Sequence, residues 1–129
     1  MRRAIQITVS LACLGVIFFS ARYALGREWV RKTDLLGLYQ QINLESFDGA
    51  LPDVVVEWGS LKDAYGETQF TDVPRVIEID SASVTSEEQL VKTMQHEACH
   101  VYTRRVVEET GQDVHGEAFQ SCMERFNEK

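Results

Sequence analysis

The sequence has little of several features that mark large classes of protein. Three cysteines in 129 residues are too few for the disulfide framework of a small secreted scaffold. There is no internal repeat, no low-complexity segment and no glycine-rich phosphate loop, which argues against repeat proteins and P-loop nucleotide-binding proteins. The length is enough for one domain and not for two.

Positive charge is scarce after the first 32 residues. Residues 33–129 carry seven basic and 19 acidic residues, a net charge of −12, whereas residues 1–32 carry a net charge of +5. An acidic domain repels nucleic acid, and we interpret its one basic pair, Arg104-Arg105, as the solvated face of a helix. We therefore expect no nucleic-acid partner.

The few cysteines are expected to be unpaired. Cys13 lies in an apolar N-terminal segment, and we expect Cys99 and Cys122 to be buried free thiols. A disulfide between Cys99 and Cys122 is one alternative. Cys122 as a fourth metal ligand is another, which we disfavour because catalytic metal sites leave that position open.

The N-terminal segment, residues 1–32, is expected to be a membrane anchor or a signal peptide. Residues 4–21 carry no charge, and as a helix they would be about 27 Å long, just enough to span a bilayer core. Cleavage at Ala24-Leu25-Gly26 would instead give a secreted or periplasmic protein. We favour a single-pass anchor because Tyr23, Trp29 and the flanking basic residues are typical of the membrane interface. The orientation stays open.

Residues 33–129 are expected to form an α+β domain with about three helices and a three-stranded sheet. The helices are expected over residues 33–47, 85–111 and 117–126, and the strands over residues 54–58, 65–71 and 76–80. The apolar face of the first helix is assigned to Leu35, Leu38, Ile42 and Leu44.

Local signals mark the ends of these elements. Thr33 is the expected N-cap of the first helix, and Thr85 or Ser86 begins a capping box at the second. Gly111 is a natural stop for that second helix. Gly66 is expected to provide a bend or bulge in the second strand.

The strongest signal is His96-Glu97-Ala98-Cys99-His100, an H-E-x-x-H motif. Residues four apart share one face of a helix, so His96 and His100 can offer two imidazole nitrogens to one metal ion. Neutral imidazole suits Zn²⁺, and Glu97 can take a proton from a water molecule that the metal activates. The core stripe of this helix is expected about a third of a turn away, at Leu90, Met94, Ala98 and Val101.

A catalytic zinc site needs a third protein ligand. His115 is the one remaining histidine, and it lies between a helix stop and a new helix, where the chain can turn back. A helix-capping or solvated His115 is the plain alternative. Glu117 or Glu124 could then serve as the ligand, as a downstream glutamate does in thermolysin-like enzymes. Phe119 and Met123 are expected to pack the last helix against the motif helix.

With these residues in place, the sequence resembles the SprT-like zinc metallopeptidase family, which includes the bacterial SprT proteins and Spartan. The resemblance covers most of the chain after the N-terminal segment, and the His-Gly-x-x-Phe element is its most discriminating part. It rests on Asn43, residues 47–52, the strand with Trp58, Gly66, residues 76–80, residues 96–100 and residues 115–119.

The resemblance implies a small zincin fold with a cleft along an edge strand. It also implies that His96, His100 and His115 are zinc ligands and that Glu97 is the catalytic base. We expect an extended protein or peptide substrate to pair with an exposed sheet edge, which we assign to residues 76–80. Tyr65 and Tyr102 are candidates for stabilising the oxyanion.

Three functions are compatible with this pattern. The first is a membrane-anchored zinc-dependent endopeptidase, which we favour because Glu97 has no purpose in zinc binding alone. The second is a non-catalytic zinc-binding domain that binds a partner protein at the membrane. The third is a DNA-associated protease like Spartan, against which the charge of residues 33–129 argues. The oligomeric state is not indicated.

Overall fold

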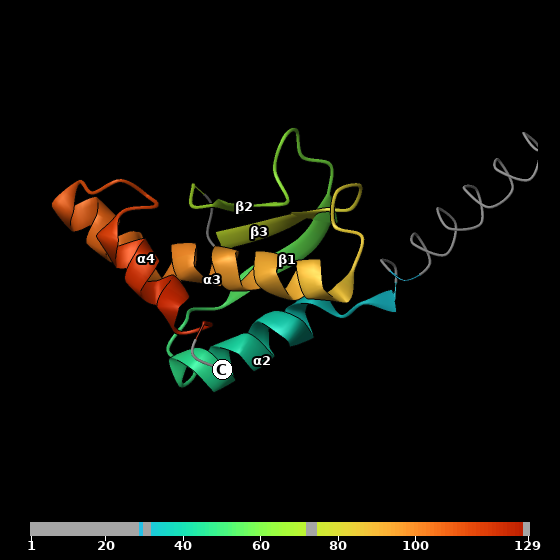
Figure 1. Ribbon diagram of the computed structural model, residues 1–129, viewed down its shortest axis with the longest axis horizontal. Coiled ribbons are helices and arrows are strands. Elements are labelled where there is room, and N and C mark those ends of the chain that lie inside the picture. The colour runs from blue at the N-terminus through green and yellow to red at the C-terminus, as the bar shows by residue number, and fades with distance from the viewer. Residues whose placement is uncertain (1–28, 30–31, 72–74, 128–129) are drawn as a thin grey trace, which may run out of the picture. The chain divides into compact units, whose positions relative to one another are not determined.

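The computed structural model of the protein describes residue 29, residues 32–71 and residues 75–127 (Figure 1). Its contacts divide the chain into two units, Met1–Thr33 and Asp34–Lys129. In the first unit, the Thr33 hydroxyl donates a hydrogen bond to the carbonyl oxygen of Trp29 at 3.0 Å. The expected anchor at residues 4–21 lies outside the described residues, and among the described ones no helix is long and apolar enough to cross a membrane.

Three helices and a three-stranded sheet make up the described part of the second unit, which confirms the predicted α+β fold. In chain order the elements are α2 (Leu35–Phe47), β1 (Val54–Gly59), β2 (Gly66–Gln69), β3 (Arg75–Asp80), α3 (Glu87–Thr110) and α4 (Glu117–Glu124).

The strand order in the sheet is β1-β3-β2, with β1 parallel and β2 antiparallel to β3. The strand expected to offer an open edge, residues 76–80, is therefore the central one, and that expectation is wrong. Ile77 and Ile79 on β3 have no exposed surface, as suits a strand paired on both sides. The short β2, with Thr68 and Gln69, is the polar edge strand instead.

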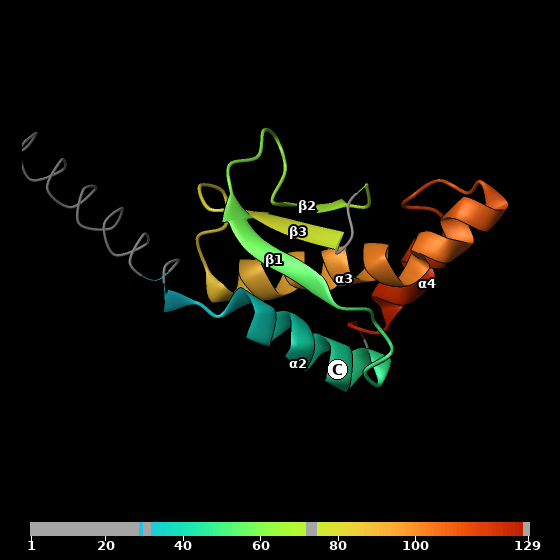
Figure 2. The same cartoon turned by 180° about the vertical axis from the view of Figure 1, so that it is seen from behind.

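Helix α3 covers one face of the sheet and contributes more buried hydrophobic residues to the core than any other described element. It lies in front of the sheet in Figure 1 and behind it in Figure 2, with α2 alongside it and beside β1. The predicted core stripe is confirmed, because all four of its residues are at most 5 % exposed: Leu90, Met94, Ala98 and Val101.

The first helix differs from expectation at both its cap and its face. Asp34, not Thr33, is the N-cap of α2, and its carboxylate accepts a hydrogen bond from the Gly37 amide at 2.9 Å. Leu44 is 70 % exposed and does not join the core. The buried residues of α2 are Leu35, Tyr39, Ile42 and Phe47, which follow the helical period that Leu44 breaks.

The ends of α3 follow the predicted pattern. Ser86 is the N-cap and accepts from the Gln89 amide at 3.2 Å, while the Gln89 side chain accepts from the Thr85 amide at 3.0 Å. Gly111 ends the helix with φ at +68°, in the left-handed region that glycine adopts without strain. α4 ends at Glu124, two residues before the expected end at Phe126.

The side chain of Asn43 ties together the two ends of the turn between α2 and β1. The Asn43 amide donates to the Leu51 carbonyl oxygen at 3.2 Å, and its oxygen accepts from the Leu51 amide at 2.9 Å. Asp48 and Gly49 in this turn both have positive φ, at 52° and 74°. The Asn43 side chain thus adds to the backbone hydrogen bonds of this turn, which run from the Gly49 amide to the Asn43 carbonyl oxygen and from the Ala50 amide to the Phe47 carbonyl oxygen.

Asp80 ties the end of β3 to the loops on either side of it. Its carboxylate is 1 % exposed and accepts from the amides of Leu61 at 2.9 Å and Ser83 at 2.8 Å. The hydrogen bonds from Ser83, Leu61 and Ala82 outweigh burial and lower the pKa of Asp80.

We predict that Asp80→Asn lowers the free energy of unfolding at neutral pH by about 1–3 kcal/mol, because an amide cannot accept these bonds as the carboxylate does. A carboxyl group with a lowered folded pKa stabilises the fold above its unfolded pKa, and this contribution is lost as the pH falls through the folded pKa. Urea unfolding should therefore show the two proteins converging in strong acid.

The matched control is Asp63→Asn, since Asp63 is exposed in the loop before β2 and asparagine tolerates its positive φ. Its effect should stay within about 0.5 kcal/mol. Equal effects of the two substitutions would contradict the role given to Asp80.

Candidate metal centre

Two histidines of the cluster come from the same face of α3. His96 and His100 are half-buried, and their Nε2 atoms lie 3.1 Å apart. They stand off the core stripe, as predicted, so the packing of α3 on the sheet leaves both rings directed into the space beside β2. The helix supplies a pair of imidazoles whose spacing is fixed by its own geometry.

The third histidine is brought back by the connection between α3 and α4. In this loop the Asp113 carboxylate accepts from the His115 amide at 2.9 Å, and the Asp113 carbonyl oxygen accepts from the Gly116 amide at 2.8 Å. His115 Nε2 then lies 3.3 Å from His96 Nε2 and 3.1 Å from His100 Nε2. His115 is exposed, but its ring faces the other two histidines, and Gly116 rather than His115 is the N-cap of α4.

The three nitrogens fit a tetrahedral metal ion. Two nitrogens at about 2.0–2.1 Å from one zinc ion, in tetrahedral directions, are about 3.3–3.4 Å apart. The observed separations of 3.1–3.3 Å are close to this value. Three ring nitrogens that face one another cannot all be satisfied by hydrogen bonds among themselves, whereas one cation can bind all three. The cluster can therefore hold a metal ion.

The alternative ligands do not join this cluster. Glu117 and Glu124 are exposed on α4 and are not among the described residues that converge with His96 and His100. Cys122 is bonded to Cys99, so its sulfur is not available to a metal.

Burial keeps the helix histidines in the form that binds a metal. It lowers the pKa of His96, and together with the neighbouring His96 and His115 it lowers the pKa of His100 to about 4. An imidazole with a lowered pKa is neutral at pH 7 and has a free lone pair. No proton must leave His96 or His100 before a metal ion binds near neutral pH.

Glu97 is buried beside the histidines and has a specific partner on the sheet. It is 3 % exposed, and its Oε2 accepts a hydrogen bond from the Thr68 hydroxyl at 2.6 Å. Burial raises the pKa of Glu97 to about 7, although the hydrogen bond from Thr68 acts in the opposite direction. A carboxyl group with this pKa can accept and return a proton near neutral pH.

Gly66 allows β2 to approach α3 closely. A Cβ atom at this position would lie 2.8 Å from Thr93 Cγ2 and 3.1 Å from Glu97 Oε1. The predicted bend or bulge at Gly66 is therefore not its role, because Gly66 pairs in register with Ile79. Thr68 was not found by sequence reasoning, since a threonine in a short polar strand has no pattern that distinguishes it.

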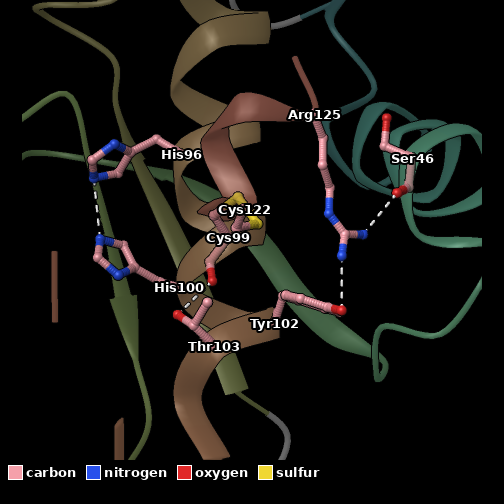
Figure 3. The surroundings of a disulfide bond; sticks show 8 residues. All are labelled: Ser46, His96, Cys99, His100, Tyr102, Thr103, Cys122 and Arg125. Atoms are coloured by element: carbon pink, nitrogen blue, oxygen red, sulfur yellow. Dashed lines mark hydrogen bonds between the residues drawn. A yellow bond between two sulfur atoms is a disulfide. The ribbon is translucent and has the colours of Figure 1, made fainter. Parts of the chain in front are cut away.

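The histidines and Glu97 open onto a cleft of about 630 Å³ between β2, α3 and the loop before α4. Tyr65 lines this cleft. Tyr102 does not line it, and its hydroxyl accepts instead from Arg125 at 2.8 Å on another side of α3 (Figure 3). Tyr102 is thereby removed as an oxyanion candidate, and Tyr65 remains.

Helix α4 packs against the cluster through Phe119, as predicted. The Phe119 ring is 4 % exposed, and its centroid lies 4.6–4.9 Å from those of the three imidazoles. Met123, the other expected contact, is half-buried.

The second link between α3 and α4 is a disulfide, which corrects the expectation of free thiols. Cys99 and Cys122 are bonded, with their Cα atoms 5.8 Å apart, and their residues are 0 % and 2 % exposed (Figure 3). Their spacing of 23 residues gave no sign of this pairing, which depends on how α4 folds back.

A model of the SprT-like family matches residues 35–129, which contain every element and residue of this site. The chain belongs to the SprT-like family. The match confirms the resemblance drawn from the sequence. No curated protein matches the chain. Within this SprT-like domain, the H-E-x-x-H helix and the His-Gly-x-x-Phe element are the two segments that the fold brings together.

We predict that Thr68→Val raises the pKa of Glu97 above about 7 in the metal-free protein, because a hydrogen bond to the charged carboxylate is lost while burial remains. The pKa can be measured from the carboxyl ¹³C shift of Glu97 during an NMR titration.

Thr71→Val is the matched control, since Thr71 is exposed just beyond the end of β2. It should leave the titration of Glu97 unchanged. A Glu97 pKa that does not move in Thr68→Val would mean that the Thr68 hydroxyl does not stabilise the carboxylate.

Proposed function

We propose that the protein is a zinc-dependent endopeptidase that hydrolyses peptide bonds in protein or peptide substrates. The observation that carries this proposal is the convergence of three imidazole nitrogens within 3.1–3.3 Å, with the buried carboxylate of Glu97 on the same helix. Membership in the SprT-like family supports the same function.

We assign His96, His100 and His115 as the zinc ligands. Three neutral imidazoles are a ligand set that suits zinc, and three protein ligands are typical of catalytic rather than structural zinc sites. When bound, zinc supplies Lewis-acid chemistry, since it acidifies water and polarises a carbonyl oxygen.

We assign Glu97 as the general base. It takes a proton from the attacking water and delivers that proton to the amine nitrogen that leaves. Its pKa of about 7 suits both transfers near neutral pH, and Thr68 fixes the direction of the carboxylate. Tyr65 is the remaining candidate for a donor to the carbonyl oxygen of the scissile bond.

The free edge of β2 is the proposed binding site for an extended substrate. β3 occupies one side of β2, and among the described residues no strand pairs with the other side, which could form backbone hydrogen bonds with a substrate along the cleft. This replaces the earlier assignment of that role to residues 76–80. Recognition through the backbone would make cleavage depend more on an extended, unfolded substrate than on its side chains.

We further propose that residues 4–21 anchor the protein and that the domain faces an oxidising compartment. A buried disulfide between Cys99 and Cys122 supports the second part, since such bonds are rare in the reducing cytosol. Cleavage of residues 1–26 as a signal peptide would place the domain in the same kind of compartment.

We do not propose DNA as a partner of this domain. The domain is strongly acidic, and both arginines of its basic pair are bound to glutamates, Arg104 to Glu108 and Arg105 to Glu109, each at 2.6 Å. A Spartan-like role would need a basic surface that these residues do not provide.

We predict that Glu97→Gln keeps zinc but loses about 10²–10⁴-fold of the rate of peptide hydrolysis, because the amide cannot take the proton. We predict that His115→Ala binds zinc much more weakly than the wild type and loses activity, because two imidazoles remain. The measurements are metal content by mass spectrometry and cleavage of an unfolded protein substrate, using the full-length chain in detergent.

Glu117→Gln is the matched control, since Glu117 was the alternative ligand nearest to His115, and it should keep both zinc and activity. Zinc in the wild type without any turnover would favour the non-catalytic binding domain. A folded wild type that takes up no zinc would remove the proposed function altogether.

A further inference from the structure

The position of His115 depends on helix α4 rather than on its own loop. Asp113 accepts hydrogen bonds from the amides of His115 and Gly116, and the Gln120 side chain donates to the His115 carbonyl oxygen at 3.1 Å. The backbone of residues 112–116 bonds to α3 only at the last residue of that helix, where the Gln112 amide donates to the Thr110 hydroxyl at 3.4 Å. Among the described residues, His115 itself meets α3 only where its ring approaches His96 and His100. The distance from His115 to the other two histidines is therefore set by how α4 sits on α3.

Helix α4 is too short to hold this position by itself. It has eight residues, and isolated helices of this length are not stable in water. Its two buried residues, Phe119 and Cys122, are one turn apart and face α3. Phe119 packs on the imidazoles of the cluster, so it cannot orient α4 independently of them.

Besides Phe119, α4 is attached to the rest of the domain by the disulfide and at its C-terminal end, where the Arg125 guanidinium lies over the rings of Phe47 and Tyr102. Arg125, just beyond the end of α4, donates to the Tyr102 hydroxyl at 2.8 Å and to the Ser46 carbonyl oxygen at 3.2 Å (Figure 3). These bonds hold the far end of the helix and are partly exposed. The disulfide is the covalent contact, and it lies nearer to His115 along the chain.

Cys99 also occupies a special position on α3. It lies between His96 and His100 in the sequence, so the helix turn that carries the two fixed ligands also carries the attachment point of α4. Reduction would remove the covalent attachment of α4 at the turn of α3 that carries the ligands.

We infer that the Cys99–Cys122 disulfide positions the third ligand, so that the affinity of the site for zinc depends on this bond. Cys99 and Cys122 are positioning residues, because they act on the metal through His115 and do not touch it. The inference rests on the proposed metal site but not on peptidase activity.

The test is a double-mutant cycle on zinc affinity, measured with the full-length chain in detergent by competition with a chelator. The four proteins are the wild type, His115→Ala, the double variant Cys99→Ala with Cys122→Ala, and the triple variant. We expect the double variant to bind zinc about 10–100-fold more weakly than the wild type. In the His115→Ala background, the same two substitutions should change zinc affinity by less than about twofold.

A disulfide that only stabilises the fold would give a different result. Zinc affinity would then fall by the same factor in both backgrounds, or would not fall at all, and either outcome overturns the inference. Asp80→Asn is the control for general destabilisation, since Asp80 lies at the end of β3 and its effect should not depend on His115. Circular dichroism in the absence of metal confirms that each variant is folded.

A second measurement needs no substitution at the cysteines. A water-soluble phosphine reduces the wild-type disulfide to two thiols and is oxidised to the phosphine oxide, with water supplying the oxygen atom and the two protons. Zinc affinity should fall on reduction and return when the bond is reformed with oxidised glutathione. Unchanged affinity in a chain shown by thiol labelling to be reduced would contradict the inference.

The outcomes also separate this inference from the proposed function. A wild type that binds no zinc removes the metal site and this inference together. If the wild type binds zinc but the cysteine substitutions weaken binding equally with and without His115, the inference is wrong and the metal site stands. If zinc affinity follows the expected cycle but the protein cleaves no peptide, the proposed peptidase activity alone is wrong.

Discussion

The packing of α3 against the sheet is the interaction on which the rest of the structure depends. One stripe of this 24-residue helix is buried in the core, where Met94 and Ala98 have no exposed surface. Because a helix is rigid over this length, the buried stripe fixes the direction of His96 and His100 on the neighbouring face. The same helix thus carries both the buried stripe and two of the three histidines, so a substitution that tilts α3 also displaces two proposed ligands.

The carboxylate of Glu97 sets the second constraint, because it is buried and has one neutral hydrogen-bond donor. Burial disfavours the charged form of the carboxyl group more than the hydrogen bond from Thr68 stabilises it, and the pKa of Glu97 is therefore raised. Thr68 can reach it only because Gly66 lets the edge strand come close to α3. The features that weaken β2 as a strand, a glycine and polar side chains, are those that let it serve as one wall of the cleft.

Local signals predicted much of this structure, and contacts between distant segments account for the errors. The ends of α3 and its buried stripe follow from capping residues and the helical period, both of which act within a few residues. The order β1-β3-β2 depends on a parallel pairing between segments about 20 residues apart, for which the sequence of residues 76–80 carries no local sign. The partnership of Thr68 with Glu97 and the Cys99–Cys122 bond are of the same kind, since each joins residues more than 20 positions apart.

The histidine cluster joins two residues of one helix, His96 and His100, to a third from a later loop, His115. The disulfide beside the cluster links that loop's segment to the helix. His96 and His100 are ordered by the helix at no further entropic cost, whereas His115 is exposed on a loop that must be ordered before it can act. The disulfide closes a ring from Cys99 to Cys122 that contains His115, which reduces the number of conformations available to that loop. A site assembled from one rigid segment and one loop gains most from restricting the loop, because the ordering cost is then met when the domain folds rather than when its ligand binds.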